Sequence, residues 1–202
     1  MDRHGWRVVL IGLWFAASAV GSAQELRGFW VDTWHEALRA PAEVDALIQR
    51  ARTAKANTLF VEVRKRGDAY YRSHYEPLAS DISPGFDPLA YLIQRARQEN
   101  PRLEVHAWLV MLPVWNSTTP PSNPAHPYNR FPQWLTLNDS GSSFDGSNFS
   151  FDPGHPDAAD YIYRVASRYQ WYAETNLAFS VLADQPGAST VNPYSVDFDI
   201  PG

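Results

Sequence analysis

The strongest constraint on the fold of this chain is a short repeat. The segment Leu-Ile-Gln-Arg-Ala-Arg occurs at positions 47–52 and again at positions 92–97. Apolar residues surround each copy at helical spacing, and a proline, Pro41 or Pro88, stands where the first helical turn would begin. Each copy is followed by an asparagine and then by an apolar segment typical of a strand. The repeat therefore predicts a unit of helix followed by strand, used twice.

Further elements can be placed around this repeat. Asn57 and Asn100 are expected to end the two helices, because asparagine tolerates the left-handed conformation found at helix ends. The expected strands are 26–33, 58–64 and 103–109, and a third helix is expected over 156–169. Strands that alternate with helices in this order form a parallel sheet with right-handed crossovers. The chain is therefore expected to be an α/β protein.

The pattern within the strands favours a barrel over an open sheet. One face of the expected strands carries polar or aromatic side chains, namely Trp30, Asp32, Phe60, Glu62, Arg64, His106 and Trp108. An open parallel sheet is covered by helices on both faces, so its strands are apolar throughout. In a (β/α) barrel, side chains of the inward face reach the mouth, where the catalysis of that fold takes place. We therefore expect a TIM-type (β/α) barrel, of which this chain supplies the N-terminal part with three to four βα units.

Composition excludes several other classes of protein. The chain has 17 basic and 22 acidic residues, a net charge of -5 and no basic stretch, so nucleic acid is not an expected partner. It has no cysteine, which excludes disulfides, thiolate metal sites and cysteine nucleophiles. No Gly-x-Gly-x-x-Gly segment follows an expected strand, and neither a His-x-x-x-His pair nor a calcium-loop spacing occurs. We expect neither a cofactor nor a metal site.

The first 23 residues have the three parts of a secretory signal peptide. Arg3 and Arg7 precede an apolar run over 8–20, and small residues lead to an expected cleavage site after Ala23. The apolar run is shorter than the roughly 20 residues that span a bilayer, so no membrane span is expected after cleavage. The alternative is an uncleaved N-terminal anchor. The protein is expected to be secreted or periplasmic.

A long segment between 113 and 156 separates the third strand from the last helix. It is rich in proline, asparagine and serine, and it lacks sustained periodicity. Its many aromatic residues argue against disorder, and loops of this length usually serve a function. After the carboxyl end of a strand, such a loop would cover the mouth of a barrel and suit an extended ligand. The alternative is a surface insertion without a role in binding.

Five sequence blocks resemble those of a known family. They occur in the family's order: Arg27-Gly28-Phe29-Trp30-Val31; Val63-Arg64 with Gly67-Asp68-Ala69-Tyr70-Tyr71-Arg72-Ser73; Pro84-Gly85-Phe86-Asp87-Pro88-Leu89; Glu104-Val105-His106-Ala107-Trp108-Leu109; and Asp152-Pro153-Gly154-His155-Pro156. On these blocks the chain resembles the glycosyl-hydrolase-like family 10 domain. The resemblance implies a (β/α) barrel, export from the cell and action on a polysaccharide, in some members the glycan strands of the bacterial cell wall.

The resemblance also implies site residues by their positions in these blocks. The expected catalytic residues are Asp152 and Asp68, and the expected substrate-binding residues are Arg64, Tyr70, His106 and Trp108, with Asp32 added from the strand pattern. Glu62 is not included, because the resemblance implies a neutral amide at its position.

Structural roles remain open for several of these residues. Arg64 could be a buried partner of Asp32 or Asp68, because its guanidinium suits a carboxylate. Asp152 could cap its own turn. His106 is also consistent with an imidazole that is buried and hydrogen-bonded in the interior.

The resemblance stops near Tyr169. The family pattern continues with a fourth strand that supplies carboxylates to the barrel mouth, whereas residues 170–202 lack that block. The sequence thus divides into a signal peptide (1–23), the N-terminal part of the barrel (24–169) and a divergent tail (170–202).

Three functions follow from this division. Glycoside hydrolysis uses two carboxyl groups, and the family pattern supplies carboxylates from the fourth strand that this sequence lacks. We therefore interpret the chain as an incomplete copy of an exported glycoside hydrolase-like protein. Its expected partner is a polysaccharide such as a peptidoglycan glycan strand. The first alternative is a non-catalytic carbohydrate-binding relic of the same barrel, and a more distant one is an envelope domain that binds protein.

Overall fold

The computed structural model describes residues 25–173, 178 and 179. The expected signal peptide and most of the expected tail lie outside these residues. Within the described part of the chain, no helix combines the length and apolar character needed to cross a membrane.

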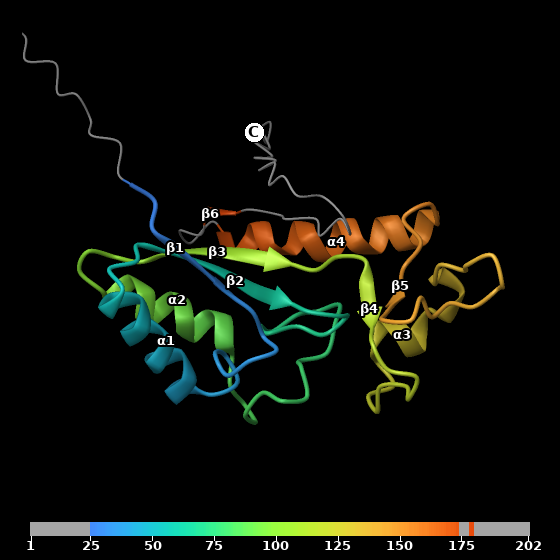
Figure 1. Cartoon of the computed structure of the whole chain (residues 1–202), viewed down its shortest axis with the longest axis horizontal. Coiled ribbons are helices and arrows are strands. Elements are labelled where there is room, and N and C mark those ends of the chain that lie inside the picture. Colours follow the sequence, from blue (N-terminus) through green and yellow to red (C-terminus); the bar gives the residue numbers. More distant parts are fainter. Residues whose placement is uncertain (1–24, 174–177, 180–202) are drawn as a thin grey trace, which may run out of the picture.

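A parallel sheet of four strands forms the centre of the described chain (Figure 1). In chain order, the elements of this part are β1 (Gly28–Val31), α1 (Pro41–Thr53), β2 (Thr58–Arg64), α2 (Pro88–Gln98), β3 (Glu104–Leu109), α4 (Pro156–Ala173) and β6 (Ala178–Phe179). The strands lie in the order β1-β2-β3-β6, and every neighbouring pair is parallel. A helix follows each of the first three strands before the next strand of the sheet begins. The prediction of a partial (β/α) barrel is therefore confirmed.

The two repeat helices form as predicted and bury matching faces. The buried apolar residues are Val44, Leu47, Ile48 and Ala51 in α1 and Leu89, Leu92, Ile93 and Ala96 in α2. The side chain of Asp87 accepts a hydrogen bond from the backbone N–H of Ala90 and thereby caps the start of α2. Both helices pack with the sheet in one hydrophobic core.

The helices end differently from the prediction. Helix α1 ends at Thr53 and α2 at Gln98. After α1 the residue in the left-handed conformation is Lys55 (φ 56°), not an asparagine. Asn57 instead accepts a hydrogen bond from the Arg27 N–H at 2.8 Å and donates to the carbonyl of residue 25 at 2.6 Å. This asparagine therefore ties the start of β1 to β2, a tertiary role that the local pattern does not reveal.

The two faces of the sheet differ in the predicted way along most of its length. The helix-covered face consists of Leu59, Val61, Val63, Val105, Ala107 and Leu109, all at most 5% exposed. On the other face Trp30 stacks on Phe60 with ring centroids 4.8 Å apart, and Trp108 meets Trp30 edge-on at 5.5 Å. Trp30 is 53% exposed, so the described part of the chain does not cover this inward face.

Arg64 departs from the predicted alternation. The register between β2 and β3 shifts between Glu62 and Arg64, which indicates a bulge in β2. After this bulge the Arg64 side chain is fully buried instead of lying exposed at the barrel mouth. Its guanidinium donates to both carboxylate oxygens of Glu76 at 2.8–2.9 Å and to the Met111 carbonyl at 2.9 Å. The Tyr161 hydroxyl of α4 lies 3.2 Å from Glu76 Oε1, so one ion pair connects β2, the chain after β3, and α4.

The segment 113–155 folds into a small lobe, where the sequence predicted a loop. Its elements are β4 (Pro113–Trp115), α3 (Pro127–Arg130), η1 (Pro132–Trp134) and β5 (Phe149–Ser150). Strands β4 and β5 pair antiparallel, and the lobe has its own apolar cluster, which α4 completes. Figure 1 shows the lobe at the end toward which the arrows of β2 and β3 point. It therefore adjoins the end of the sheet at which a barrel carries its functional groups.

The loop after β2 approaches this lobe at Gly67. Its backbone is in the left-handed region (φ +80°), and a Cβ atom there would lie 2.7 Å from Pro127 Cγ and 3.0 Å from His126 Cε1. Glycine satisfies both constraints because it has no Cβ.

Removing the charge of Glu76 tests the importance of the buried ion pair. Glu76→Gln leaves the Arg64 charge buried without a counter-charge, and we expect the free energy of unfolding to fall by about 3–5 kcal/mol. Urea unfolding measures this change. The matched control is Asp160→Asn, which removes an exposed i,i+4 partner of Arg164 and should cost no more than about 1 kcal/mol. Equal small losses in both variants would contradict the role assigned to the buried pair.

Candidate functional site

Asp32 follows β1 and presents a carboxylate at the carboxyl end of the sheet. This carboxylate accepts hydrogen bonds from the backbone N–H groups of Trp34 at 2.9 Å and His35 at 3.0 Å, and it lies 2.9 Å from His35 Nδ1. Partial burial acts to raise the pKa of Asp32, but the bonds from His35 and Trp34 outweigh burial and lower it. The side chain is 38% exposed, so an ionised carboxylate is available to a ligand.

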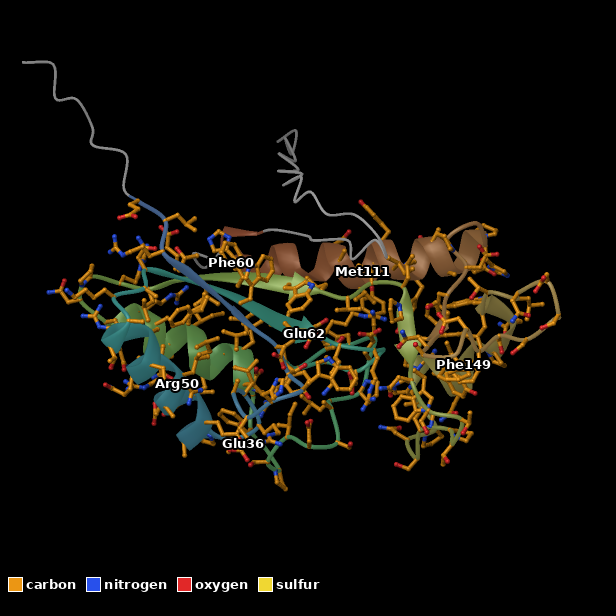
Figure 2. The ribbon with its side chains drawn as sticks, viewed as in Figure 1. Glu36, Arg50, Phe60, Glu62, Met111 and Phe149 are labelled. Carbon is orange, nitrogen blue, oxygen red and sulfur yellow. The ribbon has the colours of Figure 1, made fainter. Side chains whose placement is uncertain are left out.

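Glu62 lies on the neighbouring strand in the opposite environment. The residue is only 1% exposed, and its Oε2 accepts from the Thr33 N–H at 2.8 Å and the Thr33 hydroxyl at 2.6 Å. Burial raises the pKa of Glu62, although the bonds from Thr33 and the charge of Lys65 act in the other direction. In Figure 2, Glu62 lies nearer than Phe60 to the lobe end of β2. Near the carboxyl ends of the two strands, the pKa of one carboxyl group is therefore lowered and that of the other is raised.

Lys65 connects these strand ends to the loop after β2. Its ammonium donates to the Thr33 carbonyl at 3.1 Å and to the Tyr70 hydroxyl at 2.8 Å, and the Tyr70 hydroxyl lies 2.9 Å from Asp81 Oδ1. Burial lowers the pKa of Lys65 and raises that of Tyr70. Tyr70 is itself 0% exposed, so its hydroxyl connects the buried Lys65 to the exposed Asp81.

Arg66 joins the same loop to the lobe through two indole rings. Its guanidinium lies 4.9 Å from the centroid of the Trp34 ring and 4.7 Å from that of Trp115. It also donates to the Asn116 side chain. The backbone N–H of Arg66 is 3.3 Å from Asp68 Oδ1, and burial raises the pKa of Asp68 against the charges of the neighbouring cations.

Within the described residues, no set of three or more histidine, aspartate or glutamate side chains is arranged to hold a metal ion.

Residues 25–170 match the family described as glycosyl hydrolase-like 10. The chain belongs to the glycosyl hydrolase-like 10 family. This membership confirms the family predicted from the five sequence blocks.

Other proteins resemble this glycosyl hydrolase-like 10 chain more distantly. The glycosyl hydrolase YngK of Bacillus subtilis (strain 168) is 29% identical in an alignment over 114 residues that covers 52% of this chain and 21% of YngK. The chain thus spans about a fifth of the length of this curated relative. The crystal structure of a hypothetical protein from Ruminiclostridium thermocellum ATCC 27405 has a TM-score of 0.52 and 13% identity, with 75% of this chain and 74% of that chain covered. An α-galactosidase from Lactobacillus brevis has a TM-score of 0.49 and 15% identity, with 74% and 20% covered. At such identities the likeness to solved structures concerns the fold alone.

The structure gathers three of the predicted site residues of this glycosyl hydrolase-like 10 chain around Lys65. The Tyr70 hydroxyl accepts a hydrogen bond from Lys65 directly, and the charge of Asp68 acts to raise the Lys65 pKa. Asp32 directly precedes Thr33, whose carbonyl accepts from Lys65. Asp68 is only 7% exposed.

The other predicted site residues lie apart from this group. His106 and Trp108 are on the inward face, where the His106 ring is 5.0 Å from that of Phe60. Arg64 is enclosed by its ion pair. Asp152 lies in the lobe, is exposed and accepts a hydrogen bond from the Gly154 N–H at 2.8 Å, which is the turn-capping geometry considered from the sequence.

Four residues of this site were not predicted from the sequence. They are Trp34, Glu62, Lys65 and Arg66. Glu62 does share a strand face with Phe60, and the run Arg64-Lys65-Arg66 begins at the last residue of a strand. A cationic run at a strand's carboxyl end was the available signal, but sequence alone does not show which of its members is buried.

His126 lies at the junction of the lobe and the sheet. It is 3% exposed, its Nδ1 accepts from the Tyr128 N–H at 3.2 Å, and its ring meets that of Trp115 edge-on at 5.2 Å. Burial lowers the pKa of His126 to about 4, and the charges of Arg64 and Arg66 act in the same direction, against a hydrogen bond to the backbone of Arg66.

This depressed pKa predicts a loss of stability in acid. Between pH 6.5 and about 4 the unfolded chain binds a proton at His126 that the folded chain does not, so stability is lost as the pH falls through this window. The loss amounts to up to about 3 kcal/mol. In His126→Asn, the asparagine can still cap α3 but does not titrate, and we expect a flatter dependence of unfolding free energy on pH. Urea unfolding at pH 7, 5.5 and 4.5 checks this, and parallel curves for the variant and the wild type would contradict it.

Proposed function

We propose that this chain acts on a cell-wall or related polysaccharide, by hydrolysis that uses paired carboxyl groups at the ends of β1 and β2. Membership of the glycosyl hydrolase-like 10 family supports a carbohydrate as the substrate class. The observation that carries the mechanism is the placement of two carboxyl groups on neighbouring strands: Glu62 accepts hydrogen bonds from Thr33, the residue that follows Asp32. Their pKa values are displaced in opposite directions, lowered for Asp32 and raised for Glu62. Glycoside hydrolysis needs one carboxyl group that donates a proton and one that acts ionised.

In this proposal Asp32 is the ionised group, acting as base or nucleophile. Glu62 holds the proton that the leaving oxygen requires. Asp68 is the second candidate for the proton donor, because burial raises its pKa as well. Asp152 remains a candidate through its family position, with an exposed carboxylate in the lobe.

A second candidate function is carbohydrate binding without hydrolysis. The observation that favours it is the exposure of the carboxyl groups near Lys65. The Asp32 side chain is 38% exposed, whereas Glu62 is 1% and Asp68 7% exposed. A single accessible carboxylate suits hydrogen bonds from sugar hydroxyls better than it suits a two-carboxylate reaction.

Export from the cell is part of the proposal. It is supported by the three-part signal at residues 1–23. N-terminal sequencing of the protein recovered from the periplasm or medium tests it, and a mature chain that begins at Gln24 is the expected result.

Substitutions of the two carboxyl groups test the proposed chemistry. Asp32→Asn and Glu62→Gln should each lower the turnover of denuded peptidoglycan strands by at least about 100-fold, because each removes one acid–base function. New reducing ends measure the turnover. The glutamine in Glu62→Gln keeps an oxygen that can accept hydrogen bonds from Thr33. A loss of turnover in this variant would therefore reflect the missing carboxyl proton rather than a broken contact.

Asp160→Asn on α4 is the matched control and should hydrolyse at the wild-type rate. Wild-type rates in both Asp32→Asn and Glu62→Gln would contradict the pair. Loss of turnover in Asp68→Asn or Asp152→Asn alone would move the proton donor to that residue. Sedimentation of the wild type with insoluble polysaccharide, without new reducing ends, would favour the binding function.

A further inference from the structure

We propose that the indole of Trp34 is a stacking platform for a pyranose ring, beside the Asp32 carboxylate. This inference rests on the proposed function and deepens it, because it names the surface that holds the sugar. Trp34 belongs to none of the five blocks that resemble the family.

The first argument is the exposure of Trp34. The residue is 53% exposed and begins an exposed stretch with His35 and Glu36, directly after the buried Thr33. A ligand that covers an exposed indole removes apolar surface from water, which is favourable, so this ring offers binding energy at the carboxyl end of the sheet. Aromatic faces suit the apolar side of a sugar ring, and Trp offers the largest such face.

The second argument is that the ring is held in place before any ligand arrives. Its backbone N–H donates to Asp32, and the cationic groups of Lys65 and Arg66 lie 4.8 and 4.9 Å from the ring centroid. Lys65 is itself fixed by hydrogen bonds to Thr33 and Tyr70. A ring that is already ordered loses little side-chain entropy when a ligand stacks on it.

The third argument is the polar group beside the ring. The Asp32 carboxylate is two residues away, is held ionised by its hydrogen-bond donors and is partly exposed. A carboxylate accepts hydrogen bonds from hydroxyl groups, and charge-assisted bonds of this kind are the stronger ones. An apolar ring face with an adjoining acceptor matches the amphipathic surface of a neutral pyranose.

Arg66 extends this arrangement into the lobe. Because its guanidinium lies over both Trp34 and Trp115, the platform is supported from the lobe as well as from the sheet. Trp115 is in turn fixed by a bond from its indole N–H to the Thr119 carbonyl at 2.8 Å. The sugar would therefore lie where the sheet, the loop after β1 and the lobe meet.

Binding by variants of the full chain tests the platform. The probes are soluble oligomers of N-acetylglucosamine, soluble oligomers of glucose and denuded glycan strands, each titrated by calorimetry. For whichever probe the wild type binds, Trp34→Ala should raise the dissociation constant by about tenfold, because the stacking contact is lost. The affinity of Trp34→Phe, which retains a smaller aromatic ring, should lie between that of Trp34→Ala and that of the wild type.

Tyr163→Ala is the matched control, because Tyr163 is an aromatic residue of α4 that is 62% exposed and outside the proposed site. It should bind as tightly as the wild type. The circular dichroism spectrum of Trp34→Ala should match that of the wild type. Its thermal unfolding should show at most a small loss of stability, because about half of the residue is exposed and only its contacts with Lys65 and Arg66 are lost.

The outcomes separate this inference from the proposed function. Wild-type affinity in Trp34→Ala would overturn the platform and leave the carbohydrate function standing. Equal losses in Trp34→Ala and Tyr163→Ala would also overturn it, because they would indicate general adsorption to exposed rings. If the wild type binds none of the probes, the carbohydrate function is overturned and the platform with it.

Discussion

The buried ion pair of Arg64 and Glu76 is the interaction on which the arrangement of the other parts depends. Both side chains are fully buried, and a buried charge is tolerated only when its hydrogen-bonding groups are satisfied. Besides Glu76, the guanidinium is satisfied by the carbonyls of Val110 and Met111, just after β3. A single planar group therefore fixes where β2 ends relative to the chain that leaves β3.

This geometry positions the candidate site. Lys65 and Arg66 follow Arg64 directly, so the fixed end of β2 determines where their cationic groups lie. Lys65 turns toward β1 and holds Thr33, while Arg66 turns toward the lobe and lies over Trp115. Three consecutive cationic residues thus contact three different parts of the protein: Arg64 binds Glu76, Lys65 binds Thr33, and Arg66 lies over Trp115. The candidate site between the sheet and the lobe forms around them.

Much of the fold could be predicted from the sequence because its regularities are periodic. The repeated helix-strand unit and the strand alternation gave the parallel sheet and its two faces. Periodicity fails where a single residue is added, as at the bulge before Arg64, and it carries no information on tertiary bonds such as those of Asn57. The elements of the lobe escaped prediction because none is longer than four residues.

The candidate site was predicted less completely for related reasons. Asp32 followed from strand alternation, since it continues the inward face of β1. Glu62 lies on the same pattern but was left out because the family resemblance implied another residue there. Trp34 and Lys65 stand in loops, where burial depends on partners distant in sequence and no local pattern distinguishes an exposed ring from a packed one.

The antiparallel pairing of β4 with β5 has a consequence for how this architecture can diversify. Pro113 is paired with Ser150 and Trp115 with Phe149, so the chain enters and leaves the lobe side by side. The exposed residues 137–141 within the lobe can be lengthened, shortened or exchanged without moving β3 or the start of α4, because loop length adds little closure entropy once the two ends are held together. The sheet and the packed part of the lobe can thus remain constant while this exposed part varies, and with it the surface that the lobe presents to a ligand.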